Sequence, residues 1–271
     1  MSQRVIADVK LRRKGPVISR EGLIQWALLV IILLGWELLG RKVGTFFLAG
    51  PTQVLKAAAE LIANGELGHA LVDSLTGLAV GLLAASVAGI AVGYLMGWFP
   101  AVGKVLNPYV SALYVLPIQA LVPVIIIWLG IGAAPRILCV FLFSVFEIII
   151  NTYTGVKNVE PTYVEVARSF GADQTQLFTK VIAPHALPFI FAGLRIGASR
   201  AVKGMVVAEL MFAVTGLGGL IATYAAYYRT DAVFVVVLVL TLLGVLLNAL
   251  VLYLEKRFAP WQRSPQGGIV E

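Results

Sequence analysis

The chain has 271 residues, of which 59% are apolar and only 13% are charged, and its mean hydropathy is +0.91. A soluble globular domain is nearer half apolar, so this composition excludes one and predicts an integral membrane protein. The net charge of +7 comes from basic residues spread over the flanks of apolar segments without a continuous patch. This pattern excludes a nucleic-acid partner and favours a role of the charge in membrane topology.

Residues 1–21 form a polar tail with six basic residues, a pattern typical of a solvated segment at the cytoplasmic surface. The apolar run over 22–40 is long enough to cross about 30 Å of hydrocarbon. A cleaved signal peptide is the alternative. The run exceeds the usual signal core, however, and Trp36 and Glu37 stand where a small-residue cleavage site is needed, so we predict a first span.

The segment 53–63 has apolar residues at helical spacing, which predicts a short amphipathic helix at the outer interface. These residues are Leu55, Ala58, Ala59 and Ile62. The second span is expected over 71–98. Its glycines have spacings that let helix backbones approach closely, at Gly77, Gly81, Gly89, Gly93 and Gly97.

The third span is expected over 105–129, after a brief cytoplasmic turn at 100–104. Pro117 and Pro123 interrupt this span, and each proline removes a backbone hydrogen bond, so that nearby carbonyls need other partners. Two interpretations remain open. The span is a kinked helix that lines a wet cavity, which makes Gln119 a candidate for the solute path, or it is a simple bend buried in the bundle.

A short fourth span is expected over 137–151, with Glu147 inside it and Asn151 at its end. A carboxylate inside a span is costly, so it pairs with a cation or faces water, and by default it marks a functional site. Both residues are therefore candidates for the solute path. Packing or an ion pair is the alternative, which the position near the cytoplasmic end of the span favours.

The fifth span, over 187–214, carries three further candidates for the path. At about 100° per residue, Arg200 and Lys203 share one face, whereas Glu209 points to the opposite side. Three roles are open to the two cations: they line a path for an anion, extend to the cytoplasmic surface, or pair with Glu147 on the neighbouring span. We favour the ion pair.

The glycine-rich residues 216–219 predict a flexible outer turn, and the sixth span is expected over 232–254. Trp261 is expected at the headgroups, within a C-terminal tail over 258–271. On this map 13 lysine and arginine residues lie on the cytoplasmic side and five lie outside. An excess of cations marks the cytoplasmic side, so both termini are expected there.

A polar segment, 160–184, separates the fourth and fifth spans on the cytoplasmic side. Pro161 suits the first position of a helix, and Gly171 suits the left-handed conformation that ends one. Asp173 and Gln176 have the spacing of a capping box, which predicts a second helix up to the next proline. The segment is therefore expected to form a helix, a glycine turn and a second helix.

This segment resembles the cytoplasmic signature of the permease subunits of binding-protein-dependent ABC importers, written E-A-A, three residues, G, nine residues, I, one residue, L-P. The matching positions are Glu165, Val166, Ala167, Gly171, Val181 and Pro184. The spacing is intact, although valine replaces alanine at 166 and isoleucine at 181, and Ala183 replaces leucine. The resemblance implies an all-α integral membrane protein with six transmembrane helices of the type I ABC importer permease fold, over 22–257. It also implies that the helix over Thr162–Phe170 docks in a groove of an ATPase subunit, and that the matching residues, with Phe170, belong to this coupling region.

From about Asp73 to Trp261, the order of features is similar to the nitrate, sulfonate and taurine branch of these permeases. The resemblance implies a permease in the bacterial inner membrane for a small organic or inorganic anion, such as a sulfonate, taurine, nitrate or a carboxylate. The partners it implies are a second copy of the permease, two cytoplasmic ATPase subunits, an extracytoplasmic solute-binding protein and membrane lipid. This sequence differs from that branch at Glu147, a position where the branch commonly has proline. The glutamate puts a charge near the expected path.

The sequence contains no stretch that matches a nucleotide-binding P-loop, and it offers neither a metal cluster nor a catalytic constellation. Cys139, the single cysteine, can form no intrachain disulfide. We therefore expect a transport protein that is not itself an enzyme, and the resemblance implies that ATP and Mg²⁺ are bound by the partner ATPase. The alternative from another class is an ATP-independent secondary transporter or channel subunit, which inverted repeats would favour, but no convincing repeat is visible.

Overall fold

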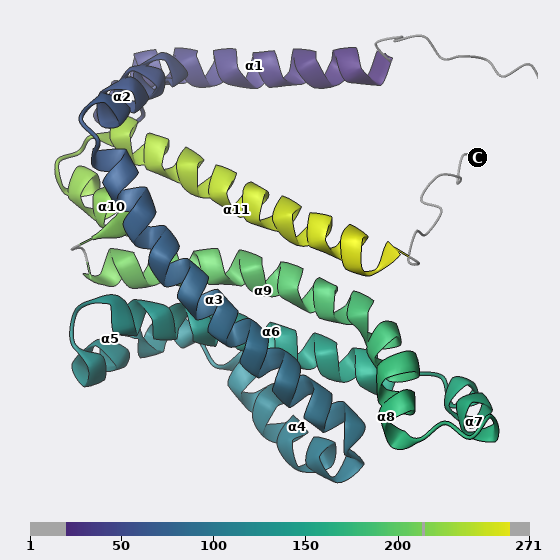
Figure 1. The fold of residues 1–271 in the computed structure, drawn as a ribbon. Helices are drawn as coiled ribbons and strands as arrows, with labels where there is room; N and C mark the ends of the chain where they lie inside the picture. Colours follow the sequence, from purple (N-terminus) through teal and green to yellow (C-terminus); the bar gives the residue numbers. More distant parts are fainter. Residues whose placement is uncertain (1–19, 213–214, 261–271) are drawn as a thin grey trace, which may run out of the picture.

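The computed structural model describes residues 20–212 and 215–260, which form helices joined by short turns (Figure 1). The helices are α1 (Arg20–Val43), α2 (Pro51–Ala63), α3 (Glu66–Trp98), α4 (Pro100–Val115), α5 (Ile118–Leu129), α6 (Ala133–Lys157), α7 (Pro161–Ser169), α8 (Gln174–Gln176), α9 (Ala183–Phe212), α10 (Gly216–Ala226) and α11 (Thr230–Phe258). Within the described residues, five helices are long and apolar enough to cross a membrane, and the bent pair α4 and α5 makes six if the pair is one broken span. The predicted all-helical membrane fold is confirmed.

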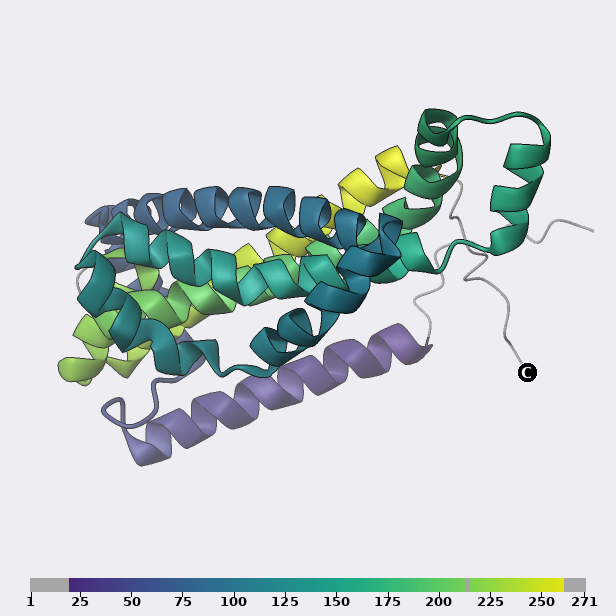
Figure 2. The same ribbon diagram turned by 90° about the horizontal axis from the view of Figure 1, so that it is seen from below.

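The long helices run between two ends of the bundle (Figures 1 and 2). The first of these, which we call the α7 end, contains α7, the start of α1 and the end of α11. The opposite end, which we call the α10 end, contains α2 and α10. The most apolar stretch of α1 has no residue buried against the rest of this chain, so its surface is available to lipid or to another subunit.

Helix α6 lies between α3 and α9, and glycines make both contacts close. A Cβ added at Gly93 of α3 would lie 2.6 Å from the carbonyl oxygen of Ile149, and one added at Gly193 of α9 would lie 2.8 Å from the Cβ of Asn151. All five glycines that the sequence singled out on α3 have such contacts, and all of these contacts are with α6. Close backbone packing at the glycine stripe is therefore confirmed, and its partner is α6.

Gly93→Ala is expected to destabilise the bundle by about 1–3 kcal/mol, because the added methyl group overlaps the backbone of α6. Gly68→Ala on the same helix is the matched control, since no atom lies within 4 Å of the added Cβ. The control should keep the stability of the parent or raise it slightly, as alanine favours a helix over glycine. The measurement is the thermal unfolding midpoint in detergent, and equal midpoints for the two variants would contradict this packing.

The third span is not the single kinked helix predicted over 105–129 but two helices, α4 and α5, bent by 93°. The break falls at Leu116, whose ψ of 129° is extended, because the ring of Pro117 disfavours the helical conformation of the residue before it. Pro123, in contrast, lies inside α5 without ending it. The predicted turn at 100–104 is also wrong, since α4 begins there.

Helix α2 is present as predicted, but it buries a different face. Val54, Ala57 and Leu61 are buried in a core shared with α10 and α11, whereas Leu55 and Ile62 are exposed. Both faces of this helix carry apolar residues, so their spacing could not decide which face the protein buries.

An ion pair also ties α2 to the start of α11. Arg229 donates from its two terminal nitrogens to the two carboxylate oxygens of Glu60, at 3.1 and 3.0 Å, and it also pairs with Asp231 at 3.0 Å. The guanidinium of Arg229 holds the pKa of Glu60 below its usual range. These groups are accessible to solvent, so the pair contributes more to alignment than to stability.

The flexible turn predicted at 216–219 is wrong, because these residues are buried and begin helix α10. Gly216 has φ +78°, a backbone conformation that favours glycine. A Cβ at this position would lie 2.5 Å from the carboxyl carbon of Glu209. The start of α10 is therefore set by a buried side chain of α9.

The helix predicted to end near Pro184 continues instead through a π-helical segment, Leu177–Ile182, into α9. Together these form one apolar helix over Gln174–Met211. Pro184 follows this segment directly, and the N–H of Ala183 before it donates to the carbonyl of Phe178, five residues back, as a π-helix requires.

Several spans also extend beyond their predicted bounds. Helix α6 covers 133–157 and not only 137–151, which puts Glu147 near the middle of the helix and not at its end. Helices α9 and α11 start before the predicted residues 187 and 232.

Candidate functional site

The segment Pro161–Gln176, which we call the elbow, consists of α7, a turn at Gly171 and the short helix α8. Gly171 has φ +78°, the left-handed conformation predicted for it. Its N–H donates to the carbonyl of Arg168 at 2.9 Å, and the N–H of Ala172 donates to the carbonyl of Ala167 at 3.0 Å. These two bonds form a Schellman motif, which satisfies the last carbonyls of α7.

The predicted capping box after this turn is confirmed. The N–H of Gln176 donates to the Asp173 carboxylate at 2.7 Å, and the N–H of Asp173 donates to the side-chain oxygen of Gln176 at 3.2 Å. These bonds fix the start of the helix that continues into α9. The elbow is therefore a defined turn between two helices and not a loose loop.

One face of α7 packs against the rest of the chain. Val164 and Ala167 are half-buried and contact a cluster that contains Leu177 and Ile182 of the following helix and Val156 of α6. Because α7 rests on both neighbouring helices, a displacement of α7 also acts on α6 and on the start of α9.

The other face of the elbow is apolar and open. Phe170 is 89% exposed, and about half of Tyr163 and of Val166 is exposed. Glu165 is exposed on the same helix. Exposed aromatic side chains on a polar loop are typical of a surface that a protein partner covers.

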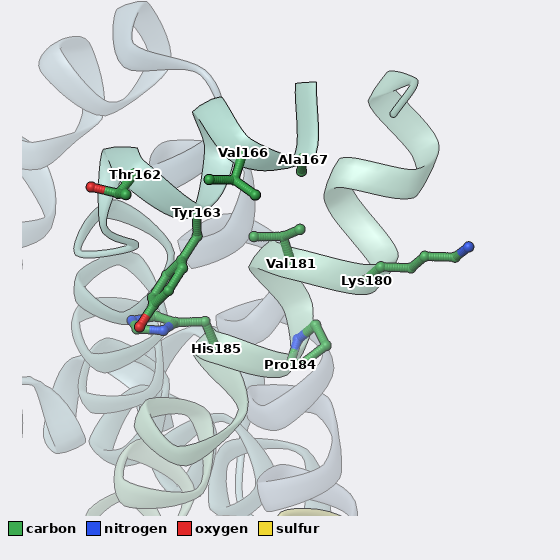
Figure 3. A pocket seen from close by; sticks show the side chains of 8 residues that line it. All are labelled: Thr162, Tyr163, Val166, Ala167, Lys180, Val181, Pro184 and His185. Atoms are coloured by element: carbon green, nitrogen blue, oxygen red, sulfur yellow. The ribbon is translucent and has the colours of Figure 1, made fainter. Parts of the chain in front are cut away.

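A groove of about 640 Å³ separates α7 from the start of α9 (Figure 3). Val166 and Val181 face each other across this groove, and Lys180 points away from it. The residues that line the groove are Thr162, Tyr163, Val166, Ala167, Lys180, Val181, Pro184 and His185. Four residues of the predicted coupling signature therefore line one groove: Val166, Ala167, Val181 and Pro184.

A polar cluster, which we call the Tyr114 cluster, joins three helices close to the break between α4 and α5. Nη2 of Arg200 on α9 lies 2.6 Å from Oε1 of Glu147 on α6 and donates to the hydroxyl of Tyr114 on α4 at 3.1 Å. Tyr114 in turn donates to Oε1 of Glu147 at 3.1 Å. The favoured ion pair with Glu147 is confirmed for Arg200, whereas Lys203 makes no ion pair with it. No sequence pattern pointed to Tyr114, because only the fold brings α4 beside α6 and α9.

The Tyr114 cluster is open on one side. The side chain of Glu147 is 7% exposed and that of Arg200 is 41% exposed, so part of the guanidinium remains free to donate to water or solute. Lys203, one turn further along α9, is exposed and has no ion-pair partner among the described residues. Asn151 donates from its amide to the carbonyl of Glu147 at 2.8 Å, and Gln119 is exposed at the start of α5.

Glu209 belongs to a different, buried network at the α10 end. Nη1 of Arg136 donates to Glu209 at 3.2 Å, and both terminal nitrogens of Arg136 bind the carboxylate of Asp73, at 2.9 and 3.0 Å. The other oxygen of Glu209 accepts from the hydroxyl of Ser74 and from the N–H of Gly218, both at 2.9 Å. With 1% of its side chain exposed, Glu209 is closed to solute in this conformation. We call these residues the Arg136 network.

The described residues therefore form a bundle of membrane-spanning helices with an ordered elbow that presents an apolar face. The family model of the binding-protein-dependent transport system inner membrane component matches residues 77–260, and the chain belongs to this family. This assignment confirms an ABC importer permease and decides against the secondary transporter or channel alternative.

Relatives and a solved structure agree with the assignment. The chain is 35% identical over 228 residues to a probable ABC transporter permease protein of Brucella abortus (strain 2308), covering 84% of this chain and 91% of the relative. It is 32% identical over 264 residues to the taurine transport system permease protein of Escherichia coli (strain K12), covering 95% and 96%. A crystal structure of an amino acid ABC transporter matches with a TM-score of 0.60 at 16% identity, over 73% of this chain and 97% of that chain, which supports the fold alone.

Proposed function

We propose that this chain forms the path of an ATP-driven importer for a small anion and that the elbow couples it to a separate ATPase subunit. The observation that carries the coupling role is the open apolar face of α7, above all Phe170. Glu165 makes polar contact with the ATPase, Ala167 allows α7 to lie close to its neighbours, and Gly171 sets the turn. Because the elbow continues into α9, closure of the ATPase pair moves α9 and switches the path between inward and outward access.

The Tyr114 cluster supports a path along α9. The free donors of Arg200 and the exposed amine of Lys203 outnumber the one carboxylate of the cluster, which suits an anionic solute. Gln119 and Asn151 supply neutral polar groups to the same path, and Glu209 joins it when the Arg136 network opens. A relative named for taurine, an aminosulfonate, agrees with a solute that carries an anionic group.

Lys203→Ala is expected to lower uptake about tenfold, the loss expected for one charge-assisted hydrogen bond to the solute. Assembly should be retained, because the lysine is exposed and pairs with no carboxylate among the described residues. Lys256→Ala, which removes an exposed lysine at the end of α11, is the matched control. The measurement is uptake of labelled taurine, methanesulfonate and nitrate into vesicles with the whole transporter. If the assembled variant takes up all three as the parent does, Lys203 has no role in the path.

The same proposal sets the partners and the topology. A second copy of the permease, two cytoplasmic ATPase subunits that bind ATP and Mg²⁺, and an extracytoplasmic solute-binding protein complete the importer in the bacterial inner membrane. α7, the start of α1 and the end of α11 share one end of the bundle, which supports cytoplasmic termini on the side of the elbow (Figure 1). The α10 end then faces the solute-binding protein.

A further inference from the structure

A second groove, with polar side chains, lies between the membrane-spanning helices α9 and α11, and none of the residues that line it belongs to the elbow groove or to the Tyr114 cluster. Its volume is about 600 Å³. The residues that line it are Arg195, Ile196, Ser199, Thr241, Gly244, Val245 and Asn248. Four of these side chains are polar, although both helices have the hydropathy of membrane spans. A polar group inside a span is costly unless it has a partner or a function.

The hydrogen bonds in the groove separate occupied groups from free ones. Ser199 donates to the carbonyl of Arg195 at 3.3 Å, and Thr241 donates to the carbonyl of Val237 at 2.8 Å, so both hydroxyl protons are used within their own helices. The guanidinium of Arg195 and the amide of Asn248 have no hydrogen-bond or ion-pair partner among the described residues. The groove therefore offers free donors and a positive charge but no carboxylate.

The guanidinium of Arg195 and the amide of Asn248 also lie at a similar distance from the α7 end of the bundle. Arg195 follows Ala183 by twelve residues, about 18 Å along α9, and Asn248 precedes Phe258 by ten residues, about 15 Å along α11. The start of α9 and the end of α11 both lie in the half of the bundle with the α7 end (Figure 1). A guanidinium and an amide that converge from facing helices can share the oxygens of one anionic group.

We propose that this groove binds one oxyanion group, a phosphodiester or a sulfonate, between the guanidinium of Arg195 and the amide of Asn248. Two sources carry this chemistry. Basic pockets between spans bind the headgroups of anionic lipids, and the exposed apolar side chains of Ile196, Leu242 and Leu246 nearby suit acyl chains. The other source is the transported solute itself.

The test uses the whole transporter in nanodiscs of phosphatidylcholine with and without phosphatidylglycerol, and it measures retained phosphatidylglycerol by native mass spectrometry. Arg195→Ala should lower retention about tenfold, Asn248→Ala should lower it several-fold, and Arg195→Lys should give a partial loss because the fork of donors is gone. Arg257→Ala, which removes an exposed cation outside the groove, should retain the lipid.

A second arm adds methanesulfonate to the phosphatidylcholine discs and measures the thermal unfolding midpoint. A rise in the midpoint that both Arg195→Ala and Asn248→Ala remove, without any effect of these variants on lipid, identifies the sulfonate as the source. The site is refuted if neither variant changes either readout, or if Arg257→Ala loses as much lipid as Arg195→Ala. It is also refuted if Arg195→Ala lowers lipid retention and Asn248→Ala does not. A single arginine that extends to the lipid headgroups, without a site in the groove, would produce that difference.

Discussion

Phe170→Ala is expected to weaken binding of the ATPase subunit by about 2 kcal/mol or more, roughly 30-fold, and to abolish solute-stimulated ATP hydrolysis. The side chain is 89% exposed at the turn of the elbow, so its loss removes no packing within this chain. An aromatic side chain that becomes fully covered at an interface, in contrast, is a typical site of large binding loss. The measurements are the affinity of the ATPase for the permease and its hydrolysis rate with and without solute and binding protein.

Phe47→Ala is the control for this experiment. Phe47 is 72% exposed, and it precedes α2, which lies at the α10 end. The same truncation there should leave ATPase binding unchanged. The assigned role of the elbow would be contradicted if Phe170→Ala kept the solute-stimulated ATP hydrolysis of the parent. It would also be contradicted if both variants lost the same amount of ATPase affinity.

Arg136→Met is expected to destabilise the bundle by about 3–5 kcal/mol, because it leaves a carboxylate buried without its cation. Glu209 has 1% of its side chain exposed and cannot be rescued by water, whereas Asp73 is 36% exposed. The Arg136 network joins α3, α6, α9 and the start of α10, so its loss should also loosen α10. The thermal unfolding midpoint of the assembled transporter measures the change.

A second substitution separates the effect of charge from that of volume. Arg136→Met combined with Glu209→Gln should recover much of the lost stability, since the buried negative charge is removed together with its partner. An equally low midpoint for the single and the double variant would mean that lost packing, and not charge, explains the destabilisation. A midpoint equal to that of the parent in Arg136→Met alone would contradict the network.

The elbow could be predicted from the sequence because its signals are local. Gly171 ends α7 through bonds within five residues, and Asp173 and Gln176 cap the next helix by themselves. The close packing of α3 through its regularly spaced glycines could also be predicted, since small residues at such spacing in a membrane span usually mark a close contact between helices. The apolar spans predicted a helical membrane protein, and the resemblance of the elbow to the permease signature implied the particular fold.

The features that escaped prediction depend on contacts between distant parts of the chain. Residues 216–219 look like a turn, yet they begin α10 because Glu209 and Ser74 satisfy its first N–H groups. Tyr114 joins Glu147 and Arg200 only because the break at Leu116 positions the end of α4 beside them. Neither fact can be deduced from spacing along one helix.

The coupling proposal is tested most directly by labelling a cysteine at the elbow. Ser169→Cys is a nearly isosteric change at an exposed position next to Phe170, and the native Cys139 is buried, so the new thiol is the reactive one. In membrane vesicles of known orientation, a maleimide that cannot cross the bilayer should label Ser169→Cys only in inside-out vesicles, and bound ATPase should protect it. Labelling from the outside, or equal labelling with and without the ATPase, would contradict the account.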